Sequence, residues 1–213
     1  MKATMLFLFI SPLFLKTTIQ AQKSVLTPDL SEVNNSKIWS LLNRKVTYDQ
    51  AVYLDKKFGD GILWLKKSSF TNGRIDLDIK GRSEQGTSFV GFAFHGLNDT
   101  TYDAIYFRPF NFKNRDRSNH SVQYVSEPQF GWSRLREEFP GKYENGVNPV
   151  PDPDAWFHAT IVIEYPVVKV FVNNAESPSL TVNQLSSRKE GWVGFWVGNT
   201  SDGYFRNLKI TIY

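Results

Sequence analysis

Four polar side chains on three neighbouring predicted strands could together bind or transform a small molecule. They are His95, Tyr106, Arg108 and Gln123. A histidine can act as acid, base or hydrogen-bond donor near neutral pH. An arginine presents a planar fork that suits paired hydroxyls or a carboxylate, and a glutamine can hydrogen-bond a sugar hydroxyl. We expect these residues to form a binding site on one sheet face, with His95 as the catalytic candidate.

Two of these residues also have a purely structural interpretation. His95 could be satisfied by the turn at Asn98 and Asp99, which follows its strand. Arg108 could pair with an acid at the edge of the core, and the available acids are Asp103, Glu127 and Glu138.

A long irregular segment, residues 128–154, adds a second group of candidates. It contains five prolines and three residues suited to ligand binding, namely Trp132, Arg136 and Tyr143. Loops of this length are uncommon in compact domains and are often functional. Trp132 could be a platform on which a sugar ring stacks, or it could pin the loop to the sheet. Trp196 has the same two interpretations, and its apolar neighbours in 191–198 favour the core.

Two aspartates on one predicted strand have the spacing of a carboxylate pair. Asp76 and Asp78 share a face of the segment RIDLDIK, but Arg74 and Lys80 flank them. Retaining glycosidases need two carboxyl groups about 5–5.5 Å apart, whereas this pattern favours a solvated ladder of ion pairs. Calcium binds oxygen ligands, and the acids that could supply them are not closely spaced in the sequence, so no metal site is predicted. Those acids are Asp99, Asp103 and Asp202.

The elements that must position these residues are about ten short strands. Strict alternation at Ile75, Leu77 and Ile79 predicts a strand with one buried face. Turn signals such as Asn72-Gly73 separate the strands, and no amphipathic helix is convincing. The pattern predicts an all-β fold, an antiparallel sandwich or barrel, and the family resemblance given below implies the two-sheet sandwich.

The first 21 residues have the pattern of a secretory signal peptide. Lys2 precedes an apolar run at 6–15, and Ala21 offers a small residue for cleavage. The run is about ten residues long, against ~20 needed to cross a bilayer. We therefore expect a single domain over 22–213, secreted or periplasmic, without a membrane span.

Composition narrows the possible functions further. The chain has no cysteine, which excludes a disulfide framework and thiolate chemistry. Its 25 Lys and Arg face 21 Asp and Glu; losing Lys2 and Lys16 with residues 1–21 would leave 23 basic residues and a net charge of +2. No basic cluster indicates nucleic-acid binding, and no motif indicates a cofactor. Aromatic residues make up 15% of the chain, which suits both strands and sugar-stacking surfaces.

Three stretches resemble a known superfamily. The segments WFHATIVIEYPVVKVFVNN and GWVGFWVGNTSDGYFRNLKI resemble the second half of a concanavalin A-like lectin/glucanase jelly roll. The stretch AIYFRPFNF…HSVQYVS is similar to strands of bacterial 3-keto-disaccharide hydrolase-like domains. The resemblance covers about residues 73–213 and implies the jelly-roll fold. The row of acids that glucanases of this fold carry is missing here.

Three functions follow as hypotheses. The first is a secreted protein that recognises a glycan or oligosaccharide on a concave sheet face. The second, implied by the resemblance, is a glycoside-acting enzyme, a hydrolase or lyase of the 3-keto-glycoside type, in which Arg108 anchors the substrate. The third is an adhesion or structural module of the laminin G type.

Overall fold

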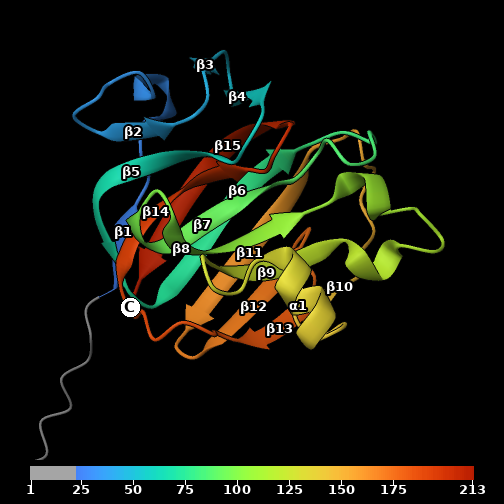
Figure 1. Ribbon diagram of the computed structural model, residues 1–213. Coiled ribbons are helices and arrows are strands. Elements are labelled where there is room, and N and C mark those ends of the chain that lie inside the picture. The colour runs from blue at the N-terminus through green and yellow to red at the C-terminus, as the bar shows by residue number, and fades with distance from the viewer. Residues whose placement is uncertain (1–22) are drawn as a thin grey trace, which may run out of the picture.

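The computed structural model of the protein describes residues 23–213, apart from the side chain of Lys67 (Figure 1). The predicted signal segment 1–21 lies outside the described residues. The described chain forms two packed antiparallel sheets of eight and seven strands, with short helices in the connections. The predicted all-β sandwich is therefore confirmed.

The eight-stranded sheet has the order β13-β12-β11-β6-β15-β4-β3, and β1 also pairs with β15. The bounds of its strands are Leu180–Asn183 (β13), Val167–Val172 (β12), Phe157–Glu164 (β11), Gly73–Lys80 (β6), Ser201–Ile212 (β15), Val52–Lys57 (β4), Val46–Tyr48 (β3) and Ser24–Leu26 (β1).

The seven-stranded sheet has the order β10-β9-β8-β7-β14-β5-β2. The bounds of its strands are Glu144–Asn145 (β10), Val122–Glu127 (β9), Thr101–Phe107 (β8), Val90–Asn98 (β7), Gly191–Val197 (β14), Gly61–Phe70 (β5) and Trp39–Leu42 (β2). The helices are Leu30–Glu32 (η1), Pro109–Asn111 (η2), Ser118–His120 (η3) and Trp132–Glu138 (α1). Figure 1 shows α1 beside β9 and β10.

The core lies between the sheets and follows from alternation along the strands. On β6, Ile75, Leu77 and Ile79 are fully buried, as the sequence predicts. On β14, Phe195 points inward and stacks at 4.7 Å on Phe205 of the opposite sheet. The alternate residues of β14 therefore face outward from the seven-stranded sheet.

Two features differ from the sequence prediction. The described chain has fifteen strands rather than about ten, because several have only two to four residues and lack a readable alternation. The segment 128–154 contains α1, a seven-residue helix that buries only Leu135. One buried residue leaves no amphipathic stripe to detect in the sequence. No helix in residues 23–213 is both long and apolar enough to cross a membrane.

Candidate functional site

A pocket of about 800 Å³ opens on the outer face of the seven-stranded sheet. It is bounded by β8, β9 and β14, by α1, and by the turns before β5 and β7. Its aromatic lining residues are Phe89, Tyr106, Phe110, Trp132 and Trp196. Its charged lining residues are Asp60, Arg108, Asp116, Arg117, Glu127 and Arg136.

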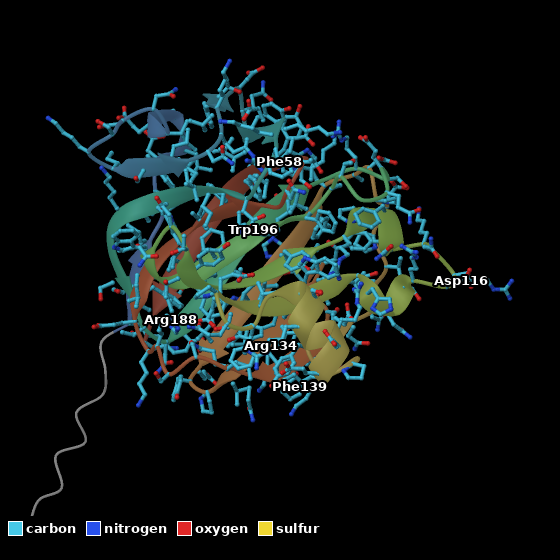
Figure 2. The ribbon with its side chains drawn as sticks, viewed as in Figure 1. Phe58, Asp116, Arg134, Phe139, Arg188 and Trp196 are labelled. Carbon is cyan, nitrogen blue, oxygen red and sulfur yellow. The ribbon has the colours of Figure 1, made fainter. Side chains whose placement is uncertain are left out.

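The aromatic part of the pocket combines buried and exposed rings. Tyr106 and Trp196 are only 3% and 6% exposed, and their ring centroids lie 5.0 Å apart. Trp132 on α1 is 54% exposed, and the Arg136 guanidinium lies over its ring, 5.5 Å from the centroid. Figure 2 shows Trp196 over the middle of the sheet. The structure thus gives Trp196 both roles considered from the sequence, since it is mostly buried and also lines the pocket.

Arg108 organises one group of polar side chains in this pocket. It follows β8 directly and is 4% exposed. Its Nη2 donates to the Tyr106 hydroxyl at 2.6 Å and to the Gln123 amide oxygen. Its Nη1 donates to the backbone oxygen of His120 at 3.0 Å and lies 3.4 Å from Glu144 Oε2. Burial lowers the pKa of Arg108, although its neighbours oppose the effect.

Glu144 joins Arg108 to two further side chains, Arg136 and His120. Arg136 donates from Nη2 at 2.8 Å and from Nε at 3.2 Å, and His120 Nδ1 lies 2.8 Å from the same carboxylate. Burial by itself would raise the pKa of Glu144, but hydrogen bonds from Arg136 and His120 lower it. Glu144 is therefore a carboxylate in the folded protein. We call Arg108, Arg136, His120 and Glu144 the basic cluster.

Asp60 and Glu127 form a second polar group, which we call the acidic pair. Asp60 accepts a hydrogen bond from the Tyr102 hydroxyl at 3.3 Å, and that hydroxyl accepts one from Trp196 Nε1 at 3.2 Å. Burial raises the pKa of Asp60. Burial, and then the negative charge of Asp60, raise the pKa of Glu127. Each carboxyl group is therefore easier to protonate than a carboxyl group in water.

The structure brings four of the six predicted ligand-binding residues to this pocket. They are Tyr106, Arg108, Trp132 and Arg136. Gln123 is paired with Tyr106 across β8 and β9 and lies behind the pocket lining, where it accepts from both Tyr106 and Arg108. Tyr143 is 4% exposed and packs against Tyr124 and Phe139, so it supports the segment that carries α1.

The structure does not bring His95, the catalytic candidate, to the pocket. A shift in the β7–β8 register after Phe94 and a φ of +48° at His95 break the alternation on which that prediction relied. The imidazole is fully buried, with Nε2 2.7 Å from the Thr71 backbone oxygen and Nδ1 3.1 Å from Gln184 Nε2. Burial lowers its pKa, which favours a neutral structural histidine.

Sequence reasoning missed the acidic pair. The alternation that places Gln123 on the outer face also places Glu127 there, four residues later on β9. That signal was available in the sequence. Asp60 has no comparable signal, because it lies in a turn before β5 and reaches the pocket only through the sheet topology.

Asp76 and Asp78 lie on β6 of the eight-stranded sheet, whereas the pocket lies on the seven-stranded sheet. Arg74 donates twice to Asp76 at 2.7 Å, and His158 Nδ1 lies 2.9 Å from Asp78. Arg206 donates to Asp78 at 3.2 Å. The predicted ladder of ion pairs is therefore present.

The acids considered for calcium also have other partners. Asp99 accepts a hydrogen bond from Trp64. Asp103 accepts hydrogen bonds from Tyr124 and Arg188. Asp202 accepts hydrogen bonds from Tyr53 and Arg82. No group of three or more potential metal-ligating side chains occurs in the described part of the chain.

Comparisons with known proteins agree with this fold. The family described as the 3-keto-alpha-glucoside-1,2-lyase-like domain matches residues 30–211. No curated protein sequence matches the chain. Among solved structures, carbohydrate-binding module CBM66 from Bacillus subtilis has a TM-score of 0.58 at 14% identity, covering 80% of this chain and 94% of its own.

Two further solved structures are similar. A protein of unknown function with a galectin-like fold, also from Bacillus subtilis, has a TM-score of 0.59 at 14% identity over 85% of this chain and 91% of its own. The lumenal domain of VIP36, bound to Ca²⁺ and Man3GlcNAc, has a TM-score of 0.58 at 11% identity over 83% and 86%. These likenesses establish a lectin-like jelly roll for this chain.

Proposed function

We propose that the pocket of this protein binds a carbohydrate. The chain belongs to the 3-keto-alpha-glucoside-1,2-lyase-like family. The observation that carries the proposal is the combination of aromatic rings and buried polar groups in one pocket on the outer face of the seven-stranded sheet. The glycan is the partner, and the seven-stranded sheet is its platform.

The chemistry of the pocket suits a sugar ring. A pyranose has an apolar C–H face and a rim of hydroxyl groups. The indole of Trp132 offers an exposed apolar face, while Arg108, Arg136, Asp60 and Glu127 offer donors and acceptors at fixed positions. Ligand pockets usually have volumes of about 300–1,000 Å³. A pocket of about 800 Å³ therefore has room for an oligosaccharide segment.

Structurally similar proteins support the same proposal. CBM66 is a carbohydrate-binding module, and VIP36 was solved with Man3GlcNAc bound. This support comes from the fold, and the choice of sugar depends on the side chains of this chain's own pocket.

Binding can be tested with the protein from Gln22 onward, on a glycan array followed by calorimetry. We expect Trp132→Ala to weaken binding about fivefold, the equivalent of about 1 kcal/mol for an aromatic stacking contact. The matched control is Trp156→Ala, because the Trp156 ring packs against Arg206 and the residue directly precedes β11 of the other sheet. Equal losses in both variants, or no binding of any saccharide, would contradict the proposal.

The acidic pair favours a second candidate function, cleavage of the bound glycoside. A carboxyl group with a raised pKa can donate a proton near neutral pH, while an ionised neighbour can accept one. Burial raises the pKa of both Asp60 and Glu127, the negative charge of Asp60 raises that of Glu127 further, and both residues line the pocket. The family description, which names a lyase, supports this candidate.

Turnover of glycosides and 3-keto-glycosides, followed by product analysis, tests this candidate. We expect Glu127→Gln and Asp60→Asn each to lower turnover by about 100-fold or more, the usual scale of general acid–base catalysis, while substrate still binds. His95→Gln is the control, since His95 is buried outside the pocket. Unchanged turnover in both pocket variants would exclude the acidic pair as the catalytic groups.

A further inference from the structure

We propose that the pocket selects saccharides with an acidic substituent, a carboxylate or a sulfate ester, and that this substituent binds at the basic cluster beside Arg117. The inference rests on the proposed carbohydrate-binding function and specifies its ligand.

The basic cluster contains more positive than negative charge. Within the described residues, Glu144 is the one acid that forms an ion pair with Arg108 or with Arg136. Two guanidinium groups that share one carboxylate leave a surplus positive charge, and His120 contacts that same carboxylate. Arg108 is 4% exposed, so water screens this charge poorly.

The cluster also keeps donors free for a ligand. The hydrogen bonds of Arg108 use Nη1 and Nη2, and those of Arg136 use Nε and Nη2. Nε of Arg108 and Nη1 of Arg136 have no hydrogen bond to any described residue. Arg117 lines the same pocket and is exposed, and its guanidinium likewise has no partner in residues 23–213. A carboxylate or sulfate accepts from such donors more strongly than a hydroxyl does.

Among the described residues that line the pocket, the acids are Asp60, Glu127 and Asp116, and Asp116 is poorly placed to cancel the charge of the basic cluster. Asp116 lines the pocket entrance but is exposed to water. Figure 2 shows it on the loop that projects from the molecule, far from Trp196. Its charge is therefore screened by solvent and salt, unlike that of Arg108.

The acidic pair gives the ligand a direction. Arg108 contacts Tyr106, the Tyr106 ring packs on Trp196, and Trp196 donates to Tyr102, which donates to Asp60. The basic cluster and Asp60 thus lie at opposite ends of this series of contacts. An anionic substituent is attracted to the basic cluster and repelled by ionised Asp60 and Glu127. We infer that the acidic group sits beside the arginines and directs the rest of the saccharide across the aromatic rings.

The test compares oligosaccharides matched in backbone but carrying a neutral, a uronate or a sulfated residue, with inorganic sulfate as a separate probe. Binding is followed by tryptophan fluorescence and calorimetry at low and high salt. We expect the uronate or the sulfated ligand to bind about tenfold more tightly than the neutral one at low salt, and high salt to reduce the difference.

Arg136→Gln should abolish that preference, whereas Arg136→Lys should retain part of it because the charge remains. Arg134→Gln is the matched control. Arg134 lies on the same helix but pairs with Glu138 at 2.9 Å, and Figure 2 shows it well away from Trp196. Arg134→Gln should leave the preference unchanged. An Arg136→Gln variant that keeps the full preference would overturn the inference.

The remaining outcomes separate the inference from the function on which it rests. Equal affinity for neutral and acidic saccharides overturns the inference and leaves carbohydrate binding intact. Inorganic sulfate that binds through Arg136 as tightly as any acidic saccharide overturns saccharide selection. If no saccharide binds at all, the proposed function fails, and the inference fails with it.

Discussion

The outer faces of the two sheets use charged residues in opposite ways. On the eight-stranded sheet, Asp76 and Asp78 are surrounded by Arg74, His158 and Arg206. Although burial opposes the effect, hydrogen bonds from His158 and its neighbours lower the pKa of both aspartates. The pKa of His158 is raised, first by its hydrogen bond to Asp76. These partners therefore favour the charged forms of Asp76, Asp78 and His158.

On the seven-stranded sheet, the acidic pair has weaker partners. Burial of Asp60 outweighs its hydrogen bond from Tyr102 and the positive charge of Arg44. None of the side-chain hydrogen bonds in residues 23–213 involves the Glu127 carboxylate. Burial therefore dominates and raises the pKa of both groups. The comparison teaches that the two faces differ in their acids. Partners hold those of the eight-stranded sheet ionised, whereas the raised pKa values of Asp60 and Glu127 mark the surface where a ligand is expected.

The largest expected difference between the faces concerns arginine. Arg108→Met should destabilise the protein by about 3–5 kcal/mol, because it takes the donor from several buried acceptors, the Tyr106 hydroxyl and the Gln123 amide oxygen among them, and one of the partners of Glu144. Arg74→Met should cost less than about 1 kcal/mol, because the Arg74 side chain is 46% exposed. Urea unfolding measures both. Similar losses would show that the two faces do not differ in this respect.

The second difference is one of sign. Asp78→Asn should lower stability at neutral pH by about 1 kcal/mol, since three charge-assisted or polar hydrogen bonds to an accessible carboxylate are weakened. Asp60→Asn should raise it, because ionised Asp60 is buried against its own preference. Thermal unfolding at neutral pH gives both signs, and a loss of stability in Asp60→Asn would contradict the comparison.

The smallest expected effect is a pH dependence on the eight-stranded sheet. The pKa of His158 is raised in the folded protein. Its contribution to the free energy of unfolding is therefore complete below the pKa of the unfolded chain, about 6.5, and is lost as pH rises through the folded pKa. Stability should fall across that window in the native protein. In His158→Asn, the loss of unfolding free energy across that window should be smaller, by less than about 1 kcal/mol. Unfolding curves of the native protein and of His158→Asn at several pH values test this slope, and identical slopes would contradict it.

Much of the fold was predictable because alternation along strands determines which residues are buried. The period of two correctly placed Ile75, Leu77 and Ile79 in the core. The same alternation placed Tyr106 and Gln123 on one face of neighbouring strands. The structure pairs these two residues, and their side chains form a hydrogen bond. These results depend only on local pattern and on the pairing of consecutive strands.

The rest of the site depends on interactions that no local pattern contains. Asp60 reaches Tyr102 only because β5 and β8 belong to one sheet, separated by β14 and β7. The raised pKa of Glu127 depends on burial and on Asp60, which is distant in sequence. His95 was misplaced for a local reason, since a register shift and a positive φ end the alternation at that residue.

The pairing of β1 with β15 has a consequence for how the chain can be rearranged. Ser24 lies opposite Ile212 and Leu26 opposite Ile210, so the ends of the described chain lie side by side, as Figure 1 shows. A short linker could join them with little loop-closure cost. A circular permutant with new ends at the Asn173–Asn174 turn would keep every strand whole. Its pocket would be built from the same side chains in a different chain order.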